Sequence, residues 1–315
     1  MTFEVEGVKM RARWAYDNVK LERFNPLGRI LSFDDFDEGV NGWAELLGNY
    51  DGTSNLDTVA RHMRDFRPPQ LSTCTFFDIG THGPMSGSYA LKLATRPVAG
   101  HTATAIKRLT MVQRGRVQFE TYFTYSAEAA VPGSRAGDDG WDANAHPSER
   151  EFGCFTLGSD LADTDGVRYH CVMRYMNTDL DGNLEQRWRY PVVVEPTPKE
   201  ILESGDELDP LADFTAPNPH DWRALDAAPQ PLCYNELPTK VNWHYLRWTI
   251  DTGRRANVEL QLNDRVYDLH HVPVPSYVQR YEALDGLLNL YVTVRTHTAT
   301  RNFLWLDAAV ISVDW

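Results

Sequence analysis

The amino-acid sequence predicts an all-β fold, a two-sheet antiparallel sandwich of the jelly-roll kind with long loops. Many short segments alternate apolar and polar residues with a period of two, which is the repeat of a β-strand that buries one face. Gly, Pro, Asn and Asp separate these segments, as they do at turns. Numerous antiparallel strands that each keep one polar face are typical of two sheets packed against each other.

Length and composition favour one large domain. All-β sandwiches commonly reach ~250 residues as one unit, so a chain of 315 residues with elaborate loops fits this class. Hydrophobic residues make up 42% of the chain and aromatic residues 11%, which is ample for a packed core and unlike a disordered protein. We therefore predict that residues 31–315 form the sandwich and that residues 1–30 form an N-terminal arm or strand.

The charge of the chain argues against two classes of partner. A formal net charge of −13 repels nucleic-acid phosphates and anionic lipids, because binding to either requires a basic surface. No run approaches the ~18 apolar residues of a transmembrane helix. The first residues also lack the basic start and apolar run of a signal peptide. The sequence thus predicts a cytoplasmic protein without nucleic-acid or membrane partners, although a chain that had lost a signal peptide would read the same.

The four cysteines do not indicate a metal or redox site. They lie far apart and form no CxxC pair: Cys74, Cys154, Cys171 and Cys233. Zinc and redox motifs normally show close spacing, so we expect buried free thiols, or two disulfides if the protein is exported.

The alternation of apolar and polar residues is clearest in two predicted strands. The first covers residues 115–125 and the second begins at residue 166. On the first, one face holds Val117, Phe119, Thr121 and Phe123, and the polar face holds Arg116, Gln118, Glu120 and Tyr122. On the second, one face holds Arg168, His170, Val172 and Arg174, and the opposite face holds Tyr169, Cys171, Met173 and Tyr175. Both polar faces are rich in arginine or aromatic residues.

Four further runs repeat the alternation, at residues 87–94, 183–194, 257–263 and 288–297. The polar positions of the run at 183–194 are Glu185, Arg187 and Arg189. Two long irregular segments interrupt the pattern, at residues 126–150 and at about 195–240. Long loops in a compact domain are usually functional or mobile, so these two are candidate walls over a binding face, with simple decoration as the alternative.

The polar positions form a candidate ligand site. If adjacent strands bring them onto one concave sheet, the following side chains converge: Arg116, Glu120, Tyr122, Arg168, His170, Arg174, Arg187 and Arg189. Sugar hydroxyls need fixed donors and acceptors, and sugar rings stack on aromatic side chains, so this mixture suits a saccharide groove. Several arginines also suit a carboxylate or phosphate on the ligand. The alternative is a lattice of Arg and Glu on a solvated sheet face.

Two kinds of catalysis are compatible with the same positions. A glycosidase needs two carboxylates ~5 to 9.5 Å apart, and Glu120 and Glu185 are the best candidates, although they lie on separate runs. A lyase needs a base, a proton donor and a cation beside the substrate carboxylate. His170 and Tyr122 could serve as base and donor, with Arg116, Arg174 or Arg187 as the cation.

A series of short motifs spans most of residues 31–315. It comprises Phe33-Asp34-Asp35-Phe36, Gly42-Trp43, the run from Gly87 to Leu93, the run from Asn242 to Asp251, and the run from Leu304 to Val310. This series resembles the concanavalin A-like lectin and glucanase superfamily, whose members commonly bind or cleave carbohydrates. The Glu-x-Asp-x-x-Glu motif of jelly-roll glucanases is not found in the chain.

The resemblance also implies a structural calcium ion near the paired chain ends. The matching acidic positions are Asp34, Asp35 and Asp307. Calcium takes ~6 to 8 oxygen ligands, which clustered aspartates and turn carbonyls supply. Surface acids at strand ends are the alternative interpretation.

Three functions follow as expectations. The first is recognition of oligosaccharides or glycosides on a concave polar face. The second is a glycoside hydrolase or polysaccharide lyase that uses the same face. The third is an accessory subunit whose polar face docks a protein partner.

Overall fold

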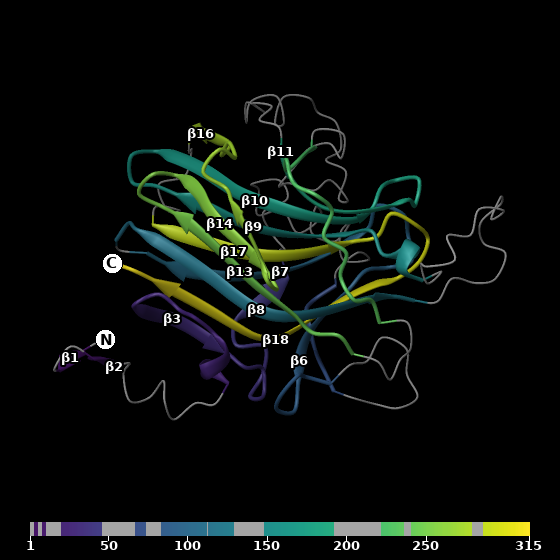
Figure 1. The fold of residues 1–315 in the computed structure, drawn as a ribbon, viewed down its shortest axis with the longest axis horizontal. Helices are drawn as coiled ribbons and strands as arrows, with labels where there is room; N and C mark the ends of the chain where they lie inside the picture. Colours follow the sequence, from purple (N-terminus) through teal and green to yellow (C-terminus); the bar gives the residue numbers. More distant parts are fainter. Residues whose placement is uncertain are drawn as a thin grey trace, which may run out of the picture.

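Two antiparallel β-sheets packed face to face make up the fold in a computed structural model (Figure 1). The structure describes residues 3–5, 8–10, 20–45, 67–73, 83–111, 113–128, 148–191, 222–235, 241–278 and 286–315. Among these residues each sheet has eight strands. The predicted all-β jelly-roll sandwich is therefore confirmed.

The first sheet is called the β10 sheet after one of its central strands. Its strand order is β12 (Trp222–Ala224), β11 (Leu184–Pro191), β10 (Val167–Thr178), β9 (Cys154–Ala162), β17 (Leu287–Arg295), β7 (Thr102–Thr110) and β4 (Trp43–Glu45). The short strand β16 (Ser276–Val278) pairs with the beginning of β10. All pairings are antiparallel.

The second sheet is called the β8 sheet. Its strand order is β15 (Arg265–Asp268), β14 (Ala256–Leu262), β13 (His244–Asp251), β8 (Arg116–Ala127), β18 (Asn302–Val313), β6 (Ala90–Ala94) and β5 (Gln70–Ser72). Strand β3 (Arg29–Asp34) pairs with the second half of β18, whereas β6 pairs with its first half. Asp307 lies where β18 changes from one partner to the other.

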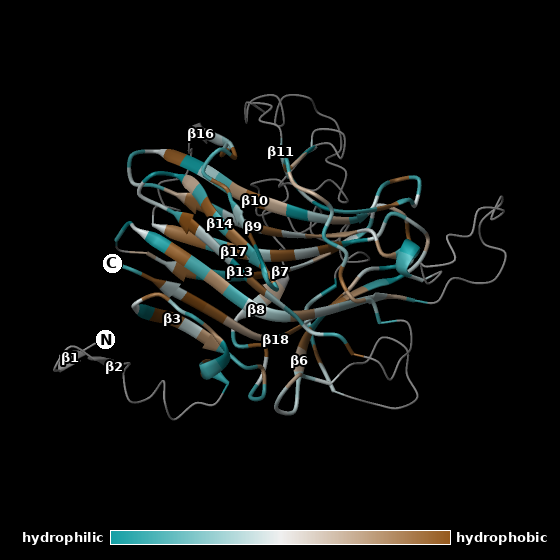
Figure 2. Cartoon of the chain, in the orientation of Figure 1, coloured by the Kyte–Doolittle hydropathy of each residue, from teal (hydrophilic) through white to brown (hydrophobic). Residues whose placement is uncertain are grey.

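Alternation along the strands builds the core between the sheets. On β8, Phe119 and Phe123 are buried, and on β10 Met173 and Tyr175 are buried from the opposite side. The hydropathy colouring shows this alternation along the strands (Figure 2). Because the inward residues of both sheets meet in one core, the polar residues between them point outward, on opposite sides of the sandwich.

The predicted strand positions agree with the structure. The run at 115–125 is β8, the run from 166 is β10, and the run at 183–194 contains β11. The runs at 257–263 and 288–297 correspond to β14 and β17. The run at 87–94 begins later than expected, at Ala90, because Gly87 has a φ of +99° in the preceding turn.

The segments outside the sandwich core fall into three groups. Strands β1 (Phe3–Val5) and β2 (Val8–Met10) form a separate two-stranded sheet. Two 3-10 turns, η1 (Leu21–Arg23) and η2 (Glu149–Glu151), are short. Within the predicted loop at 195–240, strand β12 joins the β10 sheet, while residues 195–221 and 236–240 lie outside the described residues. No helix in the described part of the chain has the length and apolar character needed to cross a membrane.

The cysteines are placed in three environments. Cys154 and Cys171 are buried and Cys233 is exposed, while Cys74 lies outside the described residues. Burial raises the pKa of the Cys171 thiol to about 12, so this group is an inert part of the core.

Candidate functional site

The predicted site residues are divided between the two outward faces of the sandwich. Arg116, Glu120 and Tyr122 lie on β8, and His170 and Arg174 lie on β10, which belongs to the other sheet. Arg168, Arg187 and Arg189 share the outward face of the β10 sheet with His170. The expectation that all eight side chains line one concave sheet is therefore wrong. A period of two assigns a residue to a face of its own strand but does not reveal which sheet that strand joins.

The outward face of the β8 sheet is called the β8 face. Glu120 points to this face but is covered by other parts of the chain. Its side chain is fully buried. The backbone N–H of Asn25 and the hydroxyl of Tyr245 donate to its Oε1 at 2.8 and 2.5 Å, and Gln118 Nε2 donates to Oε2 at 3.0 Å. These donors satisfy the carboxylate within the protein.

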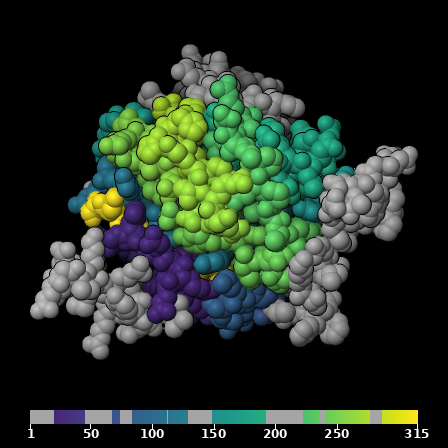
Figure 3. Space-filling model, in the orientation of Figure 1, coloured from purple at the N-terminus to yellow at the C-terminus, as the bar shows by residue number. Residues whose placement is uncertain are grey.

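Residues 20–28 cover this part of the β8 face. Leu21 and Phe24 pack on Ala308 and Val310 of β18, in a second small apolar cluster outside the main core. In the space-filling view the purple N-terminal segment lies against the green and yellow-green strands (Figure 3). The sequence predicted an arm at residues 1–30, and residues 20–28 of that arm pack against the β8 sheet.

Tyr122 is held by the same segment. Its hydroxyl donates to the carbonyl oxygen of Arg23 at 3.3 Å, and the Arg23 guanidinium lies 5.3 Å from the centre of its ring. Burial raises the pKa of Tyr122, which makes it a poor proton donor to a substrate. Arg116 is exposed at the beginning of β8, and its backbone N–H donates to Asp314 Oδ1 at 2.9 Å. The base and donor expected for a lyase, His170 and Tyr122, thus lie on opposite faces.

Each of the three aspartates of the expected calcium site forms an ion pair with a lysine or arginine side chain. Asp34 lies 3.1 Å from Lys107 Nζ and accepts from Trp43 Nε1. Lys20 Nζ lies 3.2 Å from Asp35. Within the described residues no group of three or more His, Cys, Asp and Glu side chains is arranged to hold a metal ion. Calcium binding stays a prediction, which a calcium-dependent rise in melting temperature would support.

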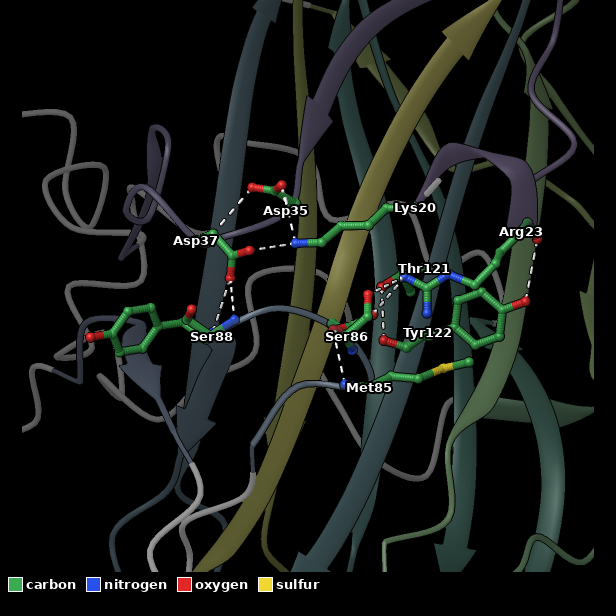
Figure 4. A network of polar contacts seen from close by, with 11 residues as sticks. Lys20, Arg23, Asp35, Asp37, Met85, Ser86, Ser88, Thr121 and Tyr122 are labelled. Atoms are coloured by element: carbon green, nitrogen blue, oxygen red, sulfur yellow. Dashed lines mark hydrogen bonds and ion pairs between the residues drawn. The ribbon is translucent and has the colours of Figure 1, made fainter. Parts of the chain in front are cut away.

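Arg23, Met85 and Ser86 lie close together on the β8 face (Figure 4), and all three donate to Asp307, which thereby links three parts of the chain. The backbone N–H groups of Met85 and Ser86 donate to its Oδ1, and Arg23 Nη2 donates to Oδ2 at 3.2 Å. Burial raises the pKa of Asp307, although Arg23 and the two N–H groups act in the other direction. Lys20 and Asp37 extend the network, because Asp37 accepts from Lys20 Nζ at 2.6 Å and from the N–H of Ser88.

The outward face of the β10 sheet, called the β10 face, carries a second polar cluster. The register places His170 of β10, Asp160 of β9 and Asn289 of β17 directly beside one another. Arg168 Nε donates to Asp160 Oδ1 at 2.6 Å, and its Nη2 contacts Oδ2. Asn289 Nδ2 donates to Oδ2 at 3.2 Å. We call these four residues the Asp160 cluster.

The electrostatics of the Asp160 cluster favour a charged aspartate beside a neutral histidine. Burial alone would raise the pKa of Asp160, but the positive charges of His170, when it is protonated, and of Arg168 outweigh it and lower the pKa below its ordinary value. Burial lowers the pKa of His170, and Arg168 lowers it further, while Asp160 acts in the opposite direction. The cluster is partly open, since the side chains of Arg168, His170 and Asp160 are 23%, 14% and 12% exposed.

Aromatic side chains lie beside the cluster on the same face. The Tyr291 ring lies across Gly158, so closely that a Cβ at Gly158 would overlap it. On the other side, the Arg174 guanidinium lies 3.8 Å from the centre of the Trp222 ring, and Arg174 Nε donates to Thr156 Oγ1 at 2.9 Å. The β10 face therefore combines hydrogen-bonding groups with two fixed aromatic rings.

Strand β11 adds further arginines to this face. Arg189 makes two hydrogen bonds to Glu185, at 2.6 and 2.7 Å, and lies opposite Arg174. Arg187 lies opposite Met176, one step farther along the strands. The predicted substrate-binding arginines Arg168, Arg174, Arg187 and Arg189 are thus on one face, whereas Arg116 is on the other.

Sequence reasoning missed several residues of the β10 face. Asp160 lies on β9, whose run of alternating residues from Cys154 to Ala162 was not recognised as a strand. Phe155, Leu157 and Leu161 on that run are buried in the core and could have revealed it. Asn289 and Tyr291 were placed on a strand but not assigned to a site, because only tertiary pairing puts them beside β9.

Comparisons with solved structures give matches of low identity and low TM-score. A peanut lectin with a bound 9-residue peptide is 6% identical, with a TM-score of 0.37, and the match covers 77% of this chain and 88% of that one. The Emp47p carbohydrate recognition domain is 8% identical, with a TM-score of 0.40 and coverage of 93% and 100%. The Crh5 transglycosylase in complex with NAG is 9% identical, with a TM-score of 0.38 and coverage of 93% and 88%.

Sequence comparisons give a family but no characterised relative. No curated protein matches the chain. A family model described as a domain of unknown function, DUF6772, matches residues 11–315. This match covers nearly all of the chain, including both sheets. The protein belongs to the DUF6772 family.

Proposed function

We propose that the protein binds a carbohydrate on the β10 face, at the Asp160 cluster. The observation that carries this proposal is the presence of a carboxylate, a guanidinium, an imidazole and an amide on three adjacent strands, with the Arg168 and His170 side chains partly exposed. Sugar hydroxyls act as both donors and acceptors, so they require such a fixed mixture of groups. Strand positions hold these groups more rigidly than loops would.

Two polar side-chain atoms on the β10 face, one of Asn289 and one of Trp222, lack a hydrogen-bond partner within the described part of the protein. Asn289 is 9% exposed, and its Oδ1 is buried without a hydrogen-bond partner in the described part of the protein. The same holds for Nε1 of Trp222, which is 5% exposed. Buried polar atoms are normally hydrogen-bonded, so a ligand hydroxyl that reaches them would satisfy them.

Binding is favoured over hydrolysis by the state of the carboxylates. Among the described side chains the β10 face presents Asp160 and Glu185, and each is held by an arginine. A general acid must deliver a proton to the leaving group, whereas both oxygens of each of these carboxylates already accept from an arginine. Glu120, the other candidate, is sealed on the β8 face.

The proposal is tested by applying the full chain to an array of neutral and acidic glycans and measuring Kd for the best ligand by calorimetry. Asp160→Asn is expected to weaken binding by about tenfold or more, because a hydrogen bond to a charged group contributes ~1.5–3 kcal/mol. Glu259→Gln is the matched control, since Glu259 pairs with Arg247 at 2.5 Å on the other sheet.

Three outcomes are informative. Binding that Asp160→Asn weakens and Glu259→Gln leaves unchanged supports the proposal. Cleavage products in the same incubations would show an enzyme and overturn the preference for binding alone. The absence of any glycan ligand would overturn the proposal itself.

A further inference from the structure

The outward side chains of the β10 face are exposed toward one end of the strands and buried toward the other. Along β10, Arg168 and His170 are partly exposed, whereas Val172, the next outward residue, is 1% exposed. Along β7, Arg108 is exposed, whereas Ile106 is 3% exposed. The end that carries the Asp160 cluster is therefore the accessible part of the described face, and β7 contributes to it as well as β10.

A row of four outward residues crosses the strands at this end. The register places Arg108 of β7 opposite Asn289 of β17, Asn289 opposite Asp160 of β9, and Asp160 opposite His170 of β10. Directly opposite residues point to the same side of a sheet, with Cβ atoms ~4.5–5.5 Å apart. Three inter-strand spacings of ~4.8 Å separate the two ends of the row. Arg108 thus extends the Asp160 cluster by one strand, and the row is longer than one sugar ring.

The amide of Asn289 has a fixed orientation in this row. Its Nδ2 donates to Asp160 Oδ2 at 3.2 Å. An ionised carboxylate only accepts hydrogen bonds, so the amide nitrogen must face Asp160 and the amide oxygen must point away from it. This oxygen, Oδ1, is buried without a donor among the described residues, and Asn289 as a whole is 9% exposed. Because buried acceptors are normally satisfied, Asn289 presents an acceptor that suits a ligand donor.

Arg108 supplies the complementary group beside Asn289. Its side chain is exposed, and it makes no hydrogen bond or ion pair with the part of the chain that the structure describes. A guanidinium group only donates hydrogen bonds, whereas an amide oxygen only accepts them. A hydroxyl group both donates and accepts, so one sugar hydroxyl placed between these two residues satisfies both.

We propose that Arg108 and Asn289 form a second saccharide subsite, next to the Asp160 cluster, which selects a neutral sugar residue through a free hydroxyl group. The hydroxyl oxygen would accept from the Arg108 guanidinium, and the hydroxyl proton would be donated to Asn289 Oδ1. A carboxylate, a sulfate or a methyl ether lacks this proton and would leave Oδ1 unsatisfied. The inference rests on the proposed function and adds the ligand class, a neutral disaccharide or longer oligosaccharide that crosses the strands from β10 to β7.

The first experiment measures the Kd of neutral disaccharides for the full chain by calorimetry. Xylobiose, cellobiose, mannobiose and galactobiose are the probes, and the galacturonate disaccharide is the acidic arm. At least one neutral disaccharide is expected to bind about tenfold or more tightly than the acidic one. Arg108→Gln is expected to weaken binding of that neutral disaccharide about fivefold or more, because it removes the charged donor of the second subsite.

The second experiment identifies the hydroxyl that Asn289 binds. Analogues of the best disaccharide are used in which one hydroxyl at a time is replaced by hydrogen or by a methyl ether. One position is expected to cost about tenfold in affinity for the unaltered protein. In Asn289→Leu, a variant of similar side-chain size, the same replacement should cost little, because the acceptor is absent. Such a cycle isolates the contact between the two groups from any general loss of affinity in the variant.

The controls separate the subsite from charge and folding. Arg254→Gln is matched to Arg108→Gln, because Arg254 is also exposed, at 78% of its side chain, but lies on the β13–β14 turn of the other sheet. It should leave the affinity for every probe unchanged. If Asn289→Leu fails to fold, Arg108→Gln carries the test, since it alters an exposed side chain without a bond to the described residues.

The possible failures are distinguishable. If Asp160→Asn weakens disaccharide binding but Arg108→Gln does not, the second subsite is wrong and the proposed function stands. Equal or tighter binding of the galacturonate disaccharide would overturn the selection of a neutral sugar. A replacement that costs the same affinity in Asn289→Leu as in the unaltered protein at every position would overturn the role of Asn289. If no saccharide binds, the proposed function and this inference both fail.

Discussion

The two outward faces of the sandwich have similar sequence patterns but different environments. On the β8 face, Glu120 is fully buried beneath residues 20–28 and receives hydrogen bonds from neutral groups. On the β10 face, Asp160 is bound by an arginine and remains partly exposed. Both carboxylates alternate with core residues on central strands.

This difference shows that alternation identifies an outward residue but not its role. A carboxylate whose acceptor capacity is used by the protein contributes to folding, as Glu120 does by joining residue 25 to β8 and β13. A carboxylate beside buried atoms that lack partners, as Asp160 lies beside Asn289, is suited to a ligand. We therefore expect substitutions on the β8 face to change mainly stability and substitutions at the Asp160 cluster to change ligand binding.

The largest expected effect is on the β8 face. Glu120→Ala leaves three donors, on Asn25, Gln118 and Tyr245, without their acceptor. Each buried donor without a partner costs about 1–3 kcal/mol, so the free energy of unfolding should fall by at least ~3 kcal/mol. Urea denaturation measures this loss, and glycan affinity of the folded fraction should not change. A tenfold loss of affinity in that fraction would show that the β8 face takes part in binding.

The second prediction concerns acid sensitivity, to which the buried and partly buried histidines with a lowered pKa contribute: His170, His244 and His297. The pKa of His297 is lowered from 6.5 to about 4, so the unfolded chain takes up this proton first as the pH falls. The resulting stability is complete above pH 6.5 and is lost as the pH falls toward 4, by up to ~3 kcal/mol. His170 acts in the same direction.

Denaturation at pH 7 and pH 4.5 tests this prediction with His297→Gln, which should lose less stability between the two pH values than the unaltered protein. His270→Gln is the control, because the side chain of His270 is 59% exposed. The shifted pKa of Asp307, on the β8 face, changes stability with pH in the opposite direction. Its raised pKa gives stability that is complete below pH 3.8 and declines as the pH rises through its folded pKa. An unchanged pH dependence in His297→Gln would contradict the contribution of His297 to acid sensitivity.

The third prediction uses the close contact of Gly158 and Tyr291. Gly158→Ala forces the Tyr291 ring to move, because the added methyl group would overlap it. Overpacking of this kind typically costs ~1–3 kcal/mol, and glycan binding should weaken as well. Gly28→Ala is the matched control, since nothing lies within 4 Å of a Cβ there. Thermal melting with glycan titration checks both effects, and equal melting temperatures for the two variants would show that Tyr291 moves freely.

The smallest effect is expected for the attachment of residues 20–28. Arg23→Gln removes the ion pair to Asp307 and the contact with the Tyr122 ring. Because Arg23 is partly exposed while Asp307 retains two backbone donors, we expect a loss of ~1–2 kcal/mol. Hydrogen exchange at residues 24–28 should increase while glycan affinity stays constant. A change in affinity without faster exchange would mean that the two faces are coupled.

The sequence by itself determined the strand-rich fold class and the inward and outward residues of most strands, such as Phe119 and Arg174. It did so because side-chain direction in a strand depends only on position along that strand. Its calcium assignment for Asp34, Asp35 and Asp307 stays a prediction, since alternation carries no information about side-chain partners.

Only the tertiary structure decided which strands became neighbours, and hence that Glu120 and His170 lie on opposite faces. The same long-range pairing brought Asp160 of β9 between His170 and Asn289, and it placed residues 20–28 over Glu120. Pairing between distant strands depends on the packing of the whole core, so a local repeat of two residues could not specify it.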